Sequence, residues 1–233
     1  MKRCVNLDWL ELHAYEPMMG TLDANYFERH GYRVERREYG TRVYREMFTI
    51  LDNNGYGMIE IRRNPASQGL HGIHQHNECH IRLTNRTCYW DNAADMLNKF
   101  ISKHQYYNVR ISRVDICYDF KEFDKGDDPA AFIRRFLKHK YSKINQGRIH
   151  AHGEDTWSGQ DWNSLSWGSK TSPVSTKMYD KTMELYNAKL DTYKKPYIRQ
   201  AWLLCGLIDD IDRCTLNGET QRIWRVEFSL TSA

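Results

Sequence analysis

The stretch "VRISRVDICYDF" (residues 109–120) decides the fold class, because apolar and polar residues alternate along it. A period of two is typical of a β-strand, whose successive side chains point to opposite faces of a sheet. One face of the expected strand carries Val114, Ile116 and Tyr118. The other face carries Arg113, Asp115, Cys117 and Asp119. The stretch therefore predicts a strand with one apolar face that belongs to a core and one polar face.

The polar face has two interpretations. Two carboxylates and a guanidinium suit a metal or phosphate site, because divalent cations such as Mg²⁺ bind several carboxylate oxygens. Alternatively, the face is exposed to solvent and its Arg and Asp form a salt bridge. We favour the first interpretation because the opposite face is so clearly apolar.

The rest of the chain contains further strand and helix patterns. Strands are expected from Val5 to near Pro17, in a hairpin over residues 32–51, and at residues 57–63, 78–85, 147–152 and 222–230. Helices are expected after Asp91, after the Asp128–Pro129 pair, and over residues 181–190 and 196–213. This mixture predicts an α+β fold, a largely antiparallel sheet with helices packed on it. We expect one domain over residues 1–233, followed by a further C-terminal segment because the chain stops just after a strand.

Composition narrows the class of protein. The 34 basic and 30 acidic residues leave a net charge of +4, and the mean hydropathy is -0.77. No apolar run approaches the roughly 20 residues of a membrane helix, and the N-terminus does not resemble a signal peptide. The six cysteines include no Cys-x-x-Cys pair, which argues against a zinc ribbon or a disulfide framework. We expect a cytoplasmic protein with reduced cysteines and no membrane partner.

Arginine and tyrosine are interleaved in "YRVERREYGTRVYREMF" (residues 32–48). Such a mixture is typical of surfaces that follow a phosphate backbone and stack on bases. The arginines that we expect to bind DNA here are Arg33, Arg36 and Arg42. The alternative is a solvated hairpin in which Glu35, Glu38 and Glu46 pair with the arginines.

A second polar face is expected on the last strand. Trp224, Val226 and Phe228 belong to its apolar face, whereas Arg225 and Glu227 share the other. If this strand lies beside residues 111–120, Glu227 completes a three-carboxylate cation site with Asp115 and Asp119. The alternative is an edge strand, on which an Arg-x-Glu pattern is common and has no function.

Histidines form two groups in the sequence. One is the pair His150 and His152, separated by one residue, so that a strand would place both on one face. This spacing is the metal-binding device of the HUH class of single-strand DNA nickases. The other group is His71, His74, His76 and His80. Either group can arise by chance in a chain with 10 histidines.

Residues 164–185, "SLSWGSKTSPVSTKMYDKTMEL", combine a Gly-Ser turn, several hydroxyls, lysines and a Tyr-Asp-Lys triplet. Gly168 permits close approach of the backbone to a phosphate. The donors suited to a phosphate are Ser166, Ser169, Lys170 and Ser172. We therefore expect this segment to border an active site.

Five segments in a fixed order carry a family resemblance. They are "VNLDWLEL" (5–12), "CHIRLTNRTC" (79–88), "RVDICYD" (113–119), "WGSKTSPVSTKMYDK" (167–181) and "WRVEFSL" (224–230). With them the chain resembles the Rep_trans family of plasmid and phage rolling-circle replication initiators, which includes relaxases of conjugative elements. The resemblance spans nearly the whole chain and implies a core like that of the HUH nickases.

The resemblance implies a metal-dependent nickase and strand transferase. A tyrosine hydroxyl attacks a phosphodiester at an origin, and leaves a 5′-phosphotyrosine and a free 3′-OH. Asp115, Asp119 and Glu227 would hold Mg²⁺ or Mn²⁺. Lys170, Lys177 and Lys181 would neutralise the phosphate or the phenolate, because an ordinary phenol has a pKa of about 10.

The resemblance also implies partners for the chain. The first is single-stranded or hairpin origin DNA, which we expect to contact Arg113, Lys170, Lys177 and Arg225 besides the hairpin arginines. A host helicase, a polymerase and a second copy of the chain are the other candidate partners.

The chain departs from the family at the nucleophile, which in the family stands two residues before the glycine of this segment. That position holds Ser166. Either another tyrosine attacks, or Ser166 itself attacks, or the chain binds DNA without cutting it. Among tyrosines, Tyr186 is the first choice because Tyr186-Asn-Ala-Lys189 matches the Tyr-x-x-Lys helix motif of HUH nickases, and Tyr179 is the second. A metal-dependent nuclease that hydrolyses with water is a further alternative.

Overall fold

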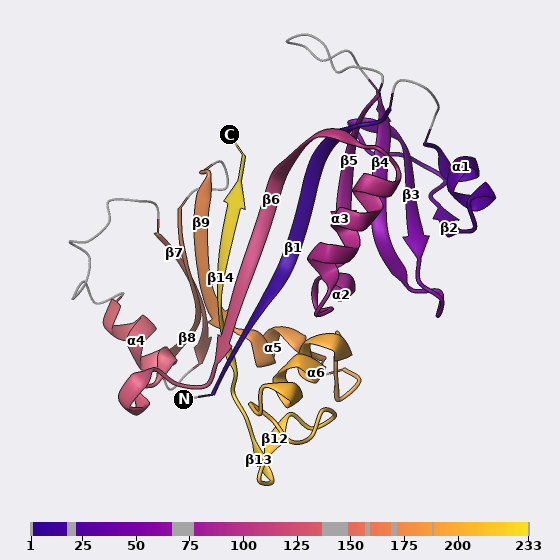
Figure 1. Cartoon of the computed structure of the whole chain (residues 1–233). Helices are drawn as coiled ribbons and strands as arrows, with labels where there is room; N and C mark the ends of the chain where they lie inside the picture. The colour runs from indigo at the N-terminus through magenta and orange to yellow at the C-terminus, as the bar shows by residue number, and fades with distance from the viewer. Residues whose placement is uncertain are drawn as a thin grey trace. The chain divides into compact units, whose positions relative to one another are not determined.

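The computed structural model describes residues 2–17, 22–66, 77–136, 149–156, 159–168, 172–187 and 189–232, with the backbone alone for the part within residues 149–163. The chain forms two compact units. The N-terminal unit holds residues 8–114 and 232, and the C-terminal unit holds residues 1–7 and 115–231. Strands β1 (Arg3–Tyr15) and β6 (Tyr107–Phe120) supply residues to both units (Figure 1). The fold is α+β, as predicted.

The N-terminal unit is an antiparallel sheet with helices against it. Its strand order is β2 (Arg33–Arg36), β3 (Tyr44–Leu51), β4 (Gly57–Pro65), β5 (Glu78–Leu83), β1 and β6. The pairs from β2 to β1 are all antiparallel. The expected hairpin over residues 32–51 is confirmed by the pairing of Arg36 with Phe48.

Among its described residues, this unit has three helices: α1 (Ala24–Arg29), α2 (Asn85–Cys88) and α3 (Ala93–Lys103). Helix α1 begins where the Asp23 side chain accepts a hydrogen bond from the backbone N–H of Tyr26 at 2.7 Å. Phe27 of α1 has ring centroids 5.6 Å from those of both Phe48 and Phe100. These contacts join α1, β3 and α3 into one core.

His104 follows α3 and is buried between two tyrosines. The Tyr26 hydroxyl lies 3.2 Å from Nδ1, and the Tyr32 hydroxyl lies 2.9 Å from Nε2. Lys103 donates to the same Tyr32 oxygen, which leaves the Tyr32 proton for Nε2. Burial, together with the charge of Lys103, lowers the pKa of His104 to about 4. The imidazole is therefore neutral at physiological pH.

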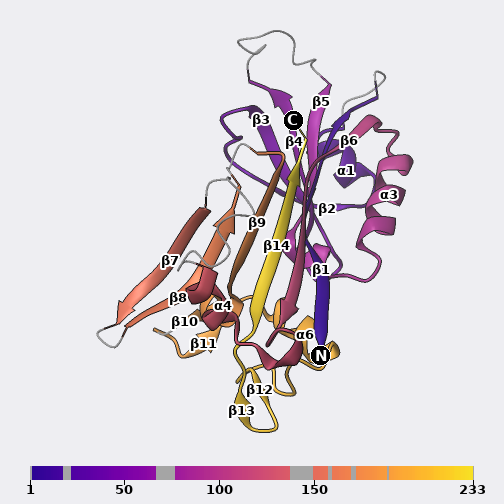
Figure 2. The same ribbon diagram turned by 90° about the vertical axis from the view of Figure 1, so that its left-hand side faces the viewer.

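In the C-terminal unit β1 and β6 are followed by β14 (Trp224–Thr231), β9 (Val174–Asp180), β8 (Gly159–Trp167) and β7 (Ile149–Thr156). Figure 2 shows β14, β9, β8 and β7 side by side in this order. The three pairs from β14 to β7 are antiparallel. The strands expected at residues 109–120 and 222–230 are thus confirmed, and so is the part of the strand expected at 147–152 that the structure describes, residues 149–152.

The apolar face of this sheet packs on helix α4 (Pro129–Arg135), which follows the short 3-10 helix Asp124–Gly126. The buried residues of this core, from the sheet and from α4, are Phe120, Ala130, Ile133, Leu165, Met178 and Trp224. The Asp128 carboxylate accepts hydrogen bonds from the backbone N–H groups of Ala130 and Ala131. The helix start expected at Asp128–Pro129 is therefore confirmed.

The two helices expected near the C-terminus are shorter than their patterns indicate. Helix α5 (Lys181–Leu185) ends where the Leu185 carbonyl accepts from the backbone N–H of Lys194. Tyr186–Asn187 then forms the two-residue strand β10, which pairs with β11 (Thr192–Tyr193). The expectation that Tyr186 lies on a helix is therefore wrong.

Helix α6 (Pro196–Leu204) ends nine residues before the predicted end at Arg213. Gly206 has a positive φ of 68°, and Leu207 donates its backbone N–H to the Trp202 carbonyl. This Schellman arrangement ends the helix, since a residue with a side chain rarely adopts such a φ. The chain then forms turns and the short pair β12 (Thr215–Leu216) and β13 (Glu219–Thr220).

All six cysteines are free thiols, and the Cys205 Sγ donates to the Cys4 Sγ at 2.9 Å. Within the described ranges, no helix has the length and apolar character that crossing a membrane requires.

Candidate active site on the polar face of the C-terminal sheet

The strand register of the C-terminal unit places polar residues in two rows across one face. Arg225 of β14 pairs with Tyr179 of β9, which pairs with Ser164 of β8. Glu227 of β14 pairs with Lys177 of β9, which pairs with Ser166 of β8. Residues directly opposite each other share a face of the sheet, and so do residues two apart on a strand. The two rows therefore form one polar face. In the backbone register, His152 and His150 of β7 follow as partners of Ser164 and Ser166.

The Tyr179 hydroxyl lies between a carboxylate and an ammonium group. It donates a hydrogen bond to Glu227 Oε2 at 3.0 Å and accepts one from Lys181 Nζ at 3.2 Å. The Lys177 ammonium lies 4.5 Å from the centroid of the Tyr179 ring, within the range of a cation–π contact. Tyr179 is 8% exposed and Lys181 is 2% exposed. A carboxylate thus stands ready to accept the phenolic proton, and two ammonium groups surround the resulting charge.

Local structure fixes Lys181 at this place. Asp180 ends β9 and caps α5, because its carboxylate accepts from the backbone N–H of Met183 at 2.9 Å. The backbone N–H of Lys181 donates to the Ile223 carbonyl at 2.9 Å, and the Ile223 N–H donates to the Thr182 hydroxyl. The first turn of α5 is therefore tied to the residue that precedes β14.

A buried ion pair lies beside the tyrosine. Arg225 donates to Asp119 through Nε at 2.7 Å and through a terminal nitrogen at 2.8 Å. Trp202 of α6 donates to the same carboxylate at 2.7 Å. Asp119 and Arg225 are both completely buried. The expectation that Arg225 contacts DNA is wrong, because its guanidinium is buried and bonded to Asp119.

Asp119 does not fit a cation site. Its two carboxylate oxygens accept from Arg225 and Trp202, so both are turned to donors rather than to an open position. Asp115 is 2% exposed, and Glu227 contacts Tyr179. Among the residues whose side chains are described, no three His, Cys, Asp or Glu are grouped as a metal site would require. Asp119 and Glu227 thus share a face, but both oxygens of Asp119 are engaged by Arg225 and Trp202.

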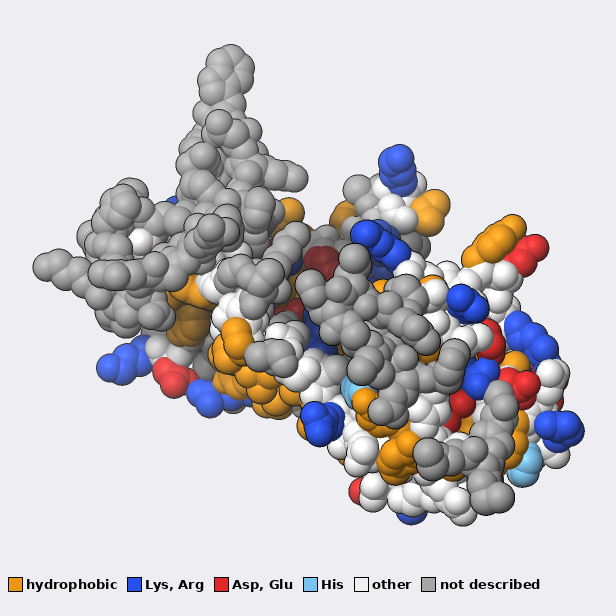
Figure 3. All heavy atoms as spheres, turned by 90° about the horizontal axis from the view of Figure 1, so that it is seen from above, with side chains coloured by type: hydrophobic (Ala, Val, Ile, Leu, Met, Phe, Trp, Pro, Cys, Tyr) orange, Lys and Arg blue, Asp and Glu red, His pale blue; other side chains and the backbone are white. Residues whose placement is uncertain are grey.

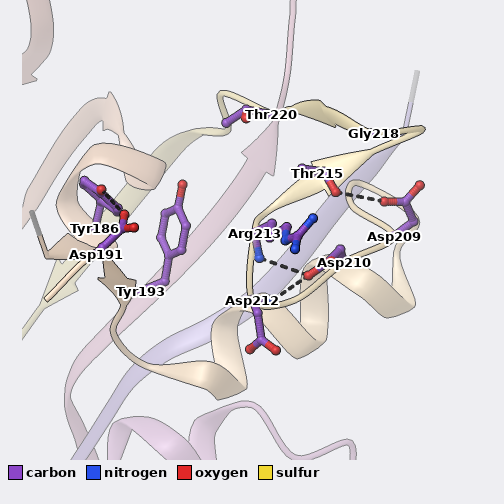
Figure 4. A pocket seen from close by; sticks show the side chains of 10 residues that line it. All are labelled: Tyr186, Asp191, Tyr193, Asp209, Asp210, Asp212, Arg213, Thr215, Gly218 and Thr220. Atoms are coloured by element: carbon purple, nitrogen blue, oxygen red, sulfur yellow. Dashed lines mark hydrogen bonds between the residues drawn. The ribbon is translucent and has the colours of Figure 1, made fainter.

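Tyr186 lies in a different environment from Tyr179. Its hydroxyl donates to Asp191 Oδ1 at 2.6 Å, and this hydrogen bond raises the pKa of Tyr186. Figure 4 shows it in a cavity of about 780 Å³ whose lining includes Asp191, Asp209, Asp210, Asp212 and Arg213. Four carboxylates and one guanidinium make this cavity acidic, which opposes the approach of a phosphodiester. The structure therefore favours Tyr179 over Tyr186.

Ser166 and Gly168 occupy the end of β8 and the turn after it. Ser166 is half-buried, opposite Lys177. Gly168 has a φ of 91°, and a Cβ there would lie 2.9 Å from the Val174 carbonyl oxygen. The glycine is therefore required by the turn of this chain itself, whether or not a phosphate approaches. Ser169 and Lys170 lie outside the described residues.

The histidine groups give little support to a metal site. His71, His74 and His76 lie outside the described residues, and for His150 and His152 only the backbone is described. His80 Nδ1 lies 3.0 Å from Glu11 Oε1 and takes part in a network of charged residues on the N-terminal sheet.

The arginine hairpin agrees with its predicted exposure only in part. Arg33 and Arg42 are exposed, and Arg36 is exposed but donates to Glu28 and Asn25 at 2.6 Å each. Tyr44 is 4% exposed and belongs to the core, so it cannot stack on a base. Figure 3 shows Lys and Arg mixed with Asp and Glu at the end of the molecule that carries α1 and β2. Arg113, in the same unit, packs its guanidinium 4.6 Å from the Trp9 ring centroid.

Sequence reasoning missed three residues of the site: Trp202, Glu184 and Lys195. Of these, only Glu184 could have been found from the sequence, because it follows Lys181 by three positions in a helical pattern. Glu227 was expected as a metal ligand, and its role as the acceptor for Tyr179 depends on strand register.

Comparison with known proteins gives a likeness in fold. No protein-family model matches the chain, and no curated protein matches it significantly in sequence. Among solved structures, the chain is similar to a rolling circle replication initiator protein from Geobacillus stearothermophilus, with a TM-score of 0.53 and 11% sequence identity. The match covers 98% of this chain and 74% of that chain. The polar face described above therefore lies on a fold that a replication initiator also has.

Proposed function

We propose that the chain is a replication initiation protein of a plasmid, phage or other mobile element, which nicks origin DNA and holds the cut end on Tyr179. The observation that carries this proposal is the placement of the Tyr179 hydroxyl between the Glu227 carboxylate and the Lys181 ammonium. The likeness in fold to a rolling circle replication initiator supports the same role.

Glu227 supplies the base for the first step. Ionising an ordinary phenol at pH 7 costs about 4 kcal/mol, because its pKa is about 10. Glu227 already accepts the phenolic hydrogen bond and takes the proton as the oxygen attacks phosphorus. The bond from Tyr179 to phosphorus forms as the bond from phosphorus to the 3′ oxygen breaks. The 3′ oxygen takes up a proton from water and becomes the free 3′-OH that a polymerase extends.

Lys181 and Lys177 stabilise the charge that develops. Lys181 Nζ is 3.2 Å from the oxygen that becomes negative, and its burial strengthens the attraction. Lys177 is exposed on the same face, next to Ser166 in the register, and is the cation placed to contact a DNA phosphate. Single-stranded or hairpin DNA is the proposed substrate.

Mg²⁺ or Mn²⁺ stays part of the proposal as a cofactor of the reaction. Asp119 does not fit such an ion, because its oxygens accept from Arg225 and Trp202, so Asp115 and Glu227 are the carboxylates left for it. If a cation acts, EDTA abolishes adduct formation, and Asp115→Asn does the same without weakening DNA binding. Full activity in EDTA would remove the metal from the proposal.

The second candidate function is binding of origin DNA without cutting. The observation that favours it is Ser166, which stands where the family resemblance implies a tyrosine. Formation of a covalent adduct separates the two functions.

The test uses hairpin oligonucleotides with randomised loops, labelled at the 3′ end so that the fragment joined to the protein carries the label. Parent protein and three variants, Tyr179→Phe, Tyr186→Phe and Ser166→Ala, are incubated with DNA and Mn²⁺ and run on a denaturing gel. We expect a labelled adduct with all except Tyr179→Phe, since that change removes only the attacking oxygen. An adduct in Tyr179→Phe would overturn the choice of nucleophile. Binding without an adduct in any protein would establish the second function instead.

A further inference from the structure

A row of side chains with alternating charge leads away from the Tyr179 hydroxyl. Lys181, which donates to the Tyr179 oxygen, also forms an ion pair with Glu184 Oε2. The other oxygen of Glu184, Oε1, lies 3.4 Å from Lys195 Nζ. The order of groups is thus Glu227, Tyr179, Lys181, Glu184 and Lys195. Lys181 thus lies between the Glu184 carboxylate and the Tyr179 oxygen, which becomes negative in the proposed reaction.

Burial makes the charge of Lys181, in the middle of this row, sensitive to the groups beside it. The Lys181 side chain is 2% exposed, whereas those of Glu184 and Lys195 are 41% and 39% exposed. Burial favours the neutral form of a lysine, and a nearby carboxylate favours the charged form. The charge of Lys181 therefore depends on Glu184 more than that of a solvated lysine would.

Glu184 is itself held in its charged form. Burial alone would raise the pKa of Glu184, but the ammonium groups of Lys181 and Lys195 hold it below its usual range. Glu184 is also three residues after Lys181 on α5, so the helix places the two side chains on one side. Tyr193, two residues before Lys195 in the chain, belongs to the β10–β11 hairpin, which brings Lys195 back to α5.

We propose that Glu184 is a positioning residue, which keeps the buried Lys181 charged and directed at the Tyr179 oxygen. Lys195 shares the charge of Glu184 and so leaves one N–H of Lys181 for Tyr179. This inference rests on the proposed function for its effect on rate, but the charge of Lys181 can be measured without any reaction.

The first experiment follows the ionisation of Lys181 in the absence of DNA. Protein with ¹³C-labelled lysine is titrated by NMR, and the Lys181 signal is identified by its loss in Lys181→Arg. In Glu184→Gln we expect the Lys181 ammonium to lose its proton at least one pH unit lower than in the parent. In Glu184→Asp most of the difference is restored, because the negative charge is kept. The matched control is Glu219→Gln, an exposed glutamate of the same unit, which leaves the titration unchanged.

The second experiment measures the rate of adduct formation against pH. In Glu184→Gln the alkaline limb of the profile moves to lower pH by the same interval as the Lys181 titration, and Lys195→Gln does not move it downward. An unchanged Lys181 titration in Glu184→Gln would overturn the inference. So would a shifted titration with an unchanged rate profile, because Lys181 would then play no part in the reaction.

The two proposals fail in different ways. If Tyr179→Phe still forms the adduct, the proposed nucleophile is wrong, and the titration alone decides the role of Glu184. If Glu184→Gln does not fold, Glu184→Ala removes the same carboxylate, and an unchanged Lys181 titration in that variant contradicts the inference.

Discussion

Tyr179 reaches Glu227 diagonally across two neighbouring strands. In the register of β9 and β14, Tyr179 pairs with Arg225, and Glu227 pairs with Lys177. The hydroxyl nevertheless lies 3.0 Å from Glu227 Oε2, because an aromatic side chain can reach a diagonal neighbour on the same face. A shift of either strand by one residue would turn its side chain to the opposite face. The contact therefore depends on the whole register of the sheet.

Replacing Glu227 with Gln tests the role of its charge. The amide keeps the shape and can still accept a hydrogen bond, but it cannot take the phenolic proton. We expect the single-turnover rate of adduct formation to fall by about 10²- to 10⁴-fold, the usual contribution of a general base. Thermal unfolding followed by circular dichroism should stay close to that of the parent, and Glu219→Gln serves as the control. A rate within twofold of the parent would rule out Glu227 as the base.

The Arg225–Asp119 pair should matter for stability rather than for DNA contact. Removing one partner of a buried ion pair leaves the other charge uncompensated and costs about 3–5 kcal/mol. We therefore expect Asp119→Asn and Arg225→Met to lower the free energy of unfolding in urea by amounts of this order. The double variant Asp119→Leu with Arg225→Met should be far less destabilised than the sum of the single variants, since no charge is left unpaired. Single variants as stable as the parent would contradict the buried pair.

His104 gives the N-terminal unit a dependence on pH. Its pKa is lowered from 6.5 to about 4 in the folded protein, so the unfolded chain binds the proton more readily. Protonation therefore favours unfolding, and stability should be full above pH 6.5 and fall as the pH drops from 6.5 toward 4. The total loss is at most about 3.5 kcal/mol, from about 1.4 kcal/mol per pH unit over the interval from 6.5 to about 4.

Urea unfolding at a series of pH values measures this effect. His104→Gln keeps one donor and one acceptor for the two tyrosines but does not titrate, so the slope between pH 6.5 and 4 should disappear from its curve. His30→Gln, an exposed histidine of the same unit, should keep most of the slope, because burial and Lys103 still lower the pKa of His104. An equal slope in all three proteins would assign the effect to other groups.

The arginine hairpin can be tested with matched pairs of substitutions. Arg33→Gln with Arg42→Gln removes two exposed guanidiniums of the hairpin, and Arg134→Gln with Arg135→Gln removes two from α4. If the hairpin binds single-stranded DNA, the first pair should flatten the dependence of log affinity on log salt by about 1.4, about 0.7 for each lost phosphate contact. The α4 pair should change the slope less. Equal slopes in both would leave only the solvated-hairpin interpretation.

The sequence predicted most of the strands, because alternation is a local property, but it misjudged the burial of the faces of β6. Ile116 of the apolar face is 40% exposed, whereas Asp115 and Asp119 of the polar face are buried. The polar face of β6 was read correctly as unusual, yet its cause was missed. Asp119 is paired with the charged Arg225 and accepts a hydrogen bond from Trp202, which are 106 and 83 residues away, and no local pattern indicates such contacts.

The choice between the two tyrosines shows the same limit. Tyr186 was preferred because its Tyr-x-x-Lys spacing suits a helix. The helix stops at Leu185, whose carbonyl accepts from Lys194 after the chain turns back. The advantage of Tyr179 comes from Glu227, which lies 48 residues later and meets it only through strand pairing.

Ser166 and Tyr179 stand on the same face of adjacent strands, one register step apart, since Ser164 pairs with Tyr179 and Ser166 with Lys177. Neighbouring strands are only about 4.8 Å apart, so a tyrosine side chain from either strand can bring its oxygen to the same point. In an enzyme of the proposed kind, the tyrosine that supplies the reactive oxygen can thus move to another position in the sequence, while the carboxylate and the ammonium around that oxygen stay in place. Searches that look for the tyrosine at one alignment column would count such a chain as inactive. What has to be kept is a location in space, and several sequences can supply it.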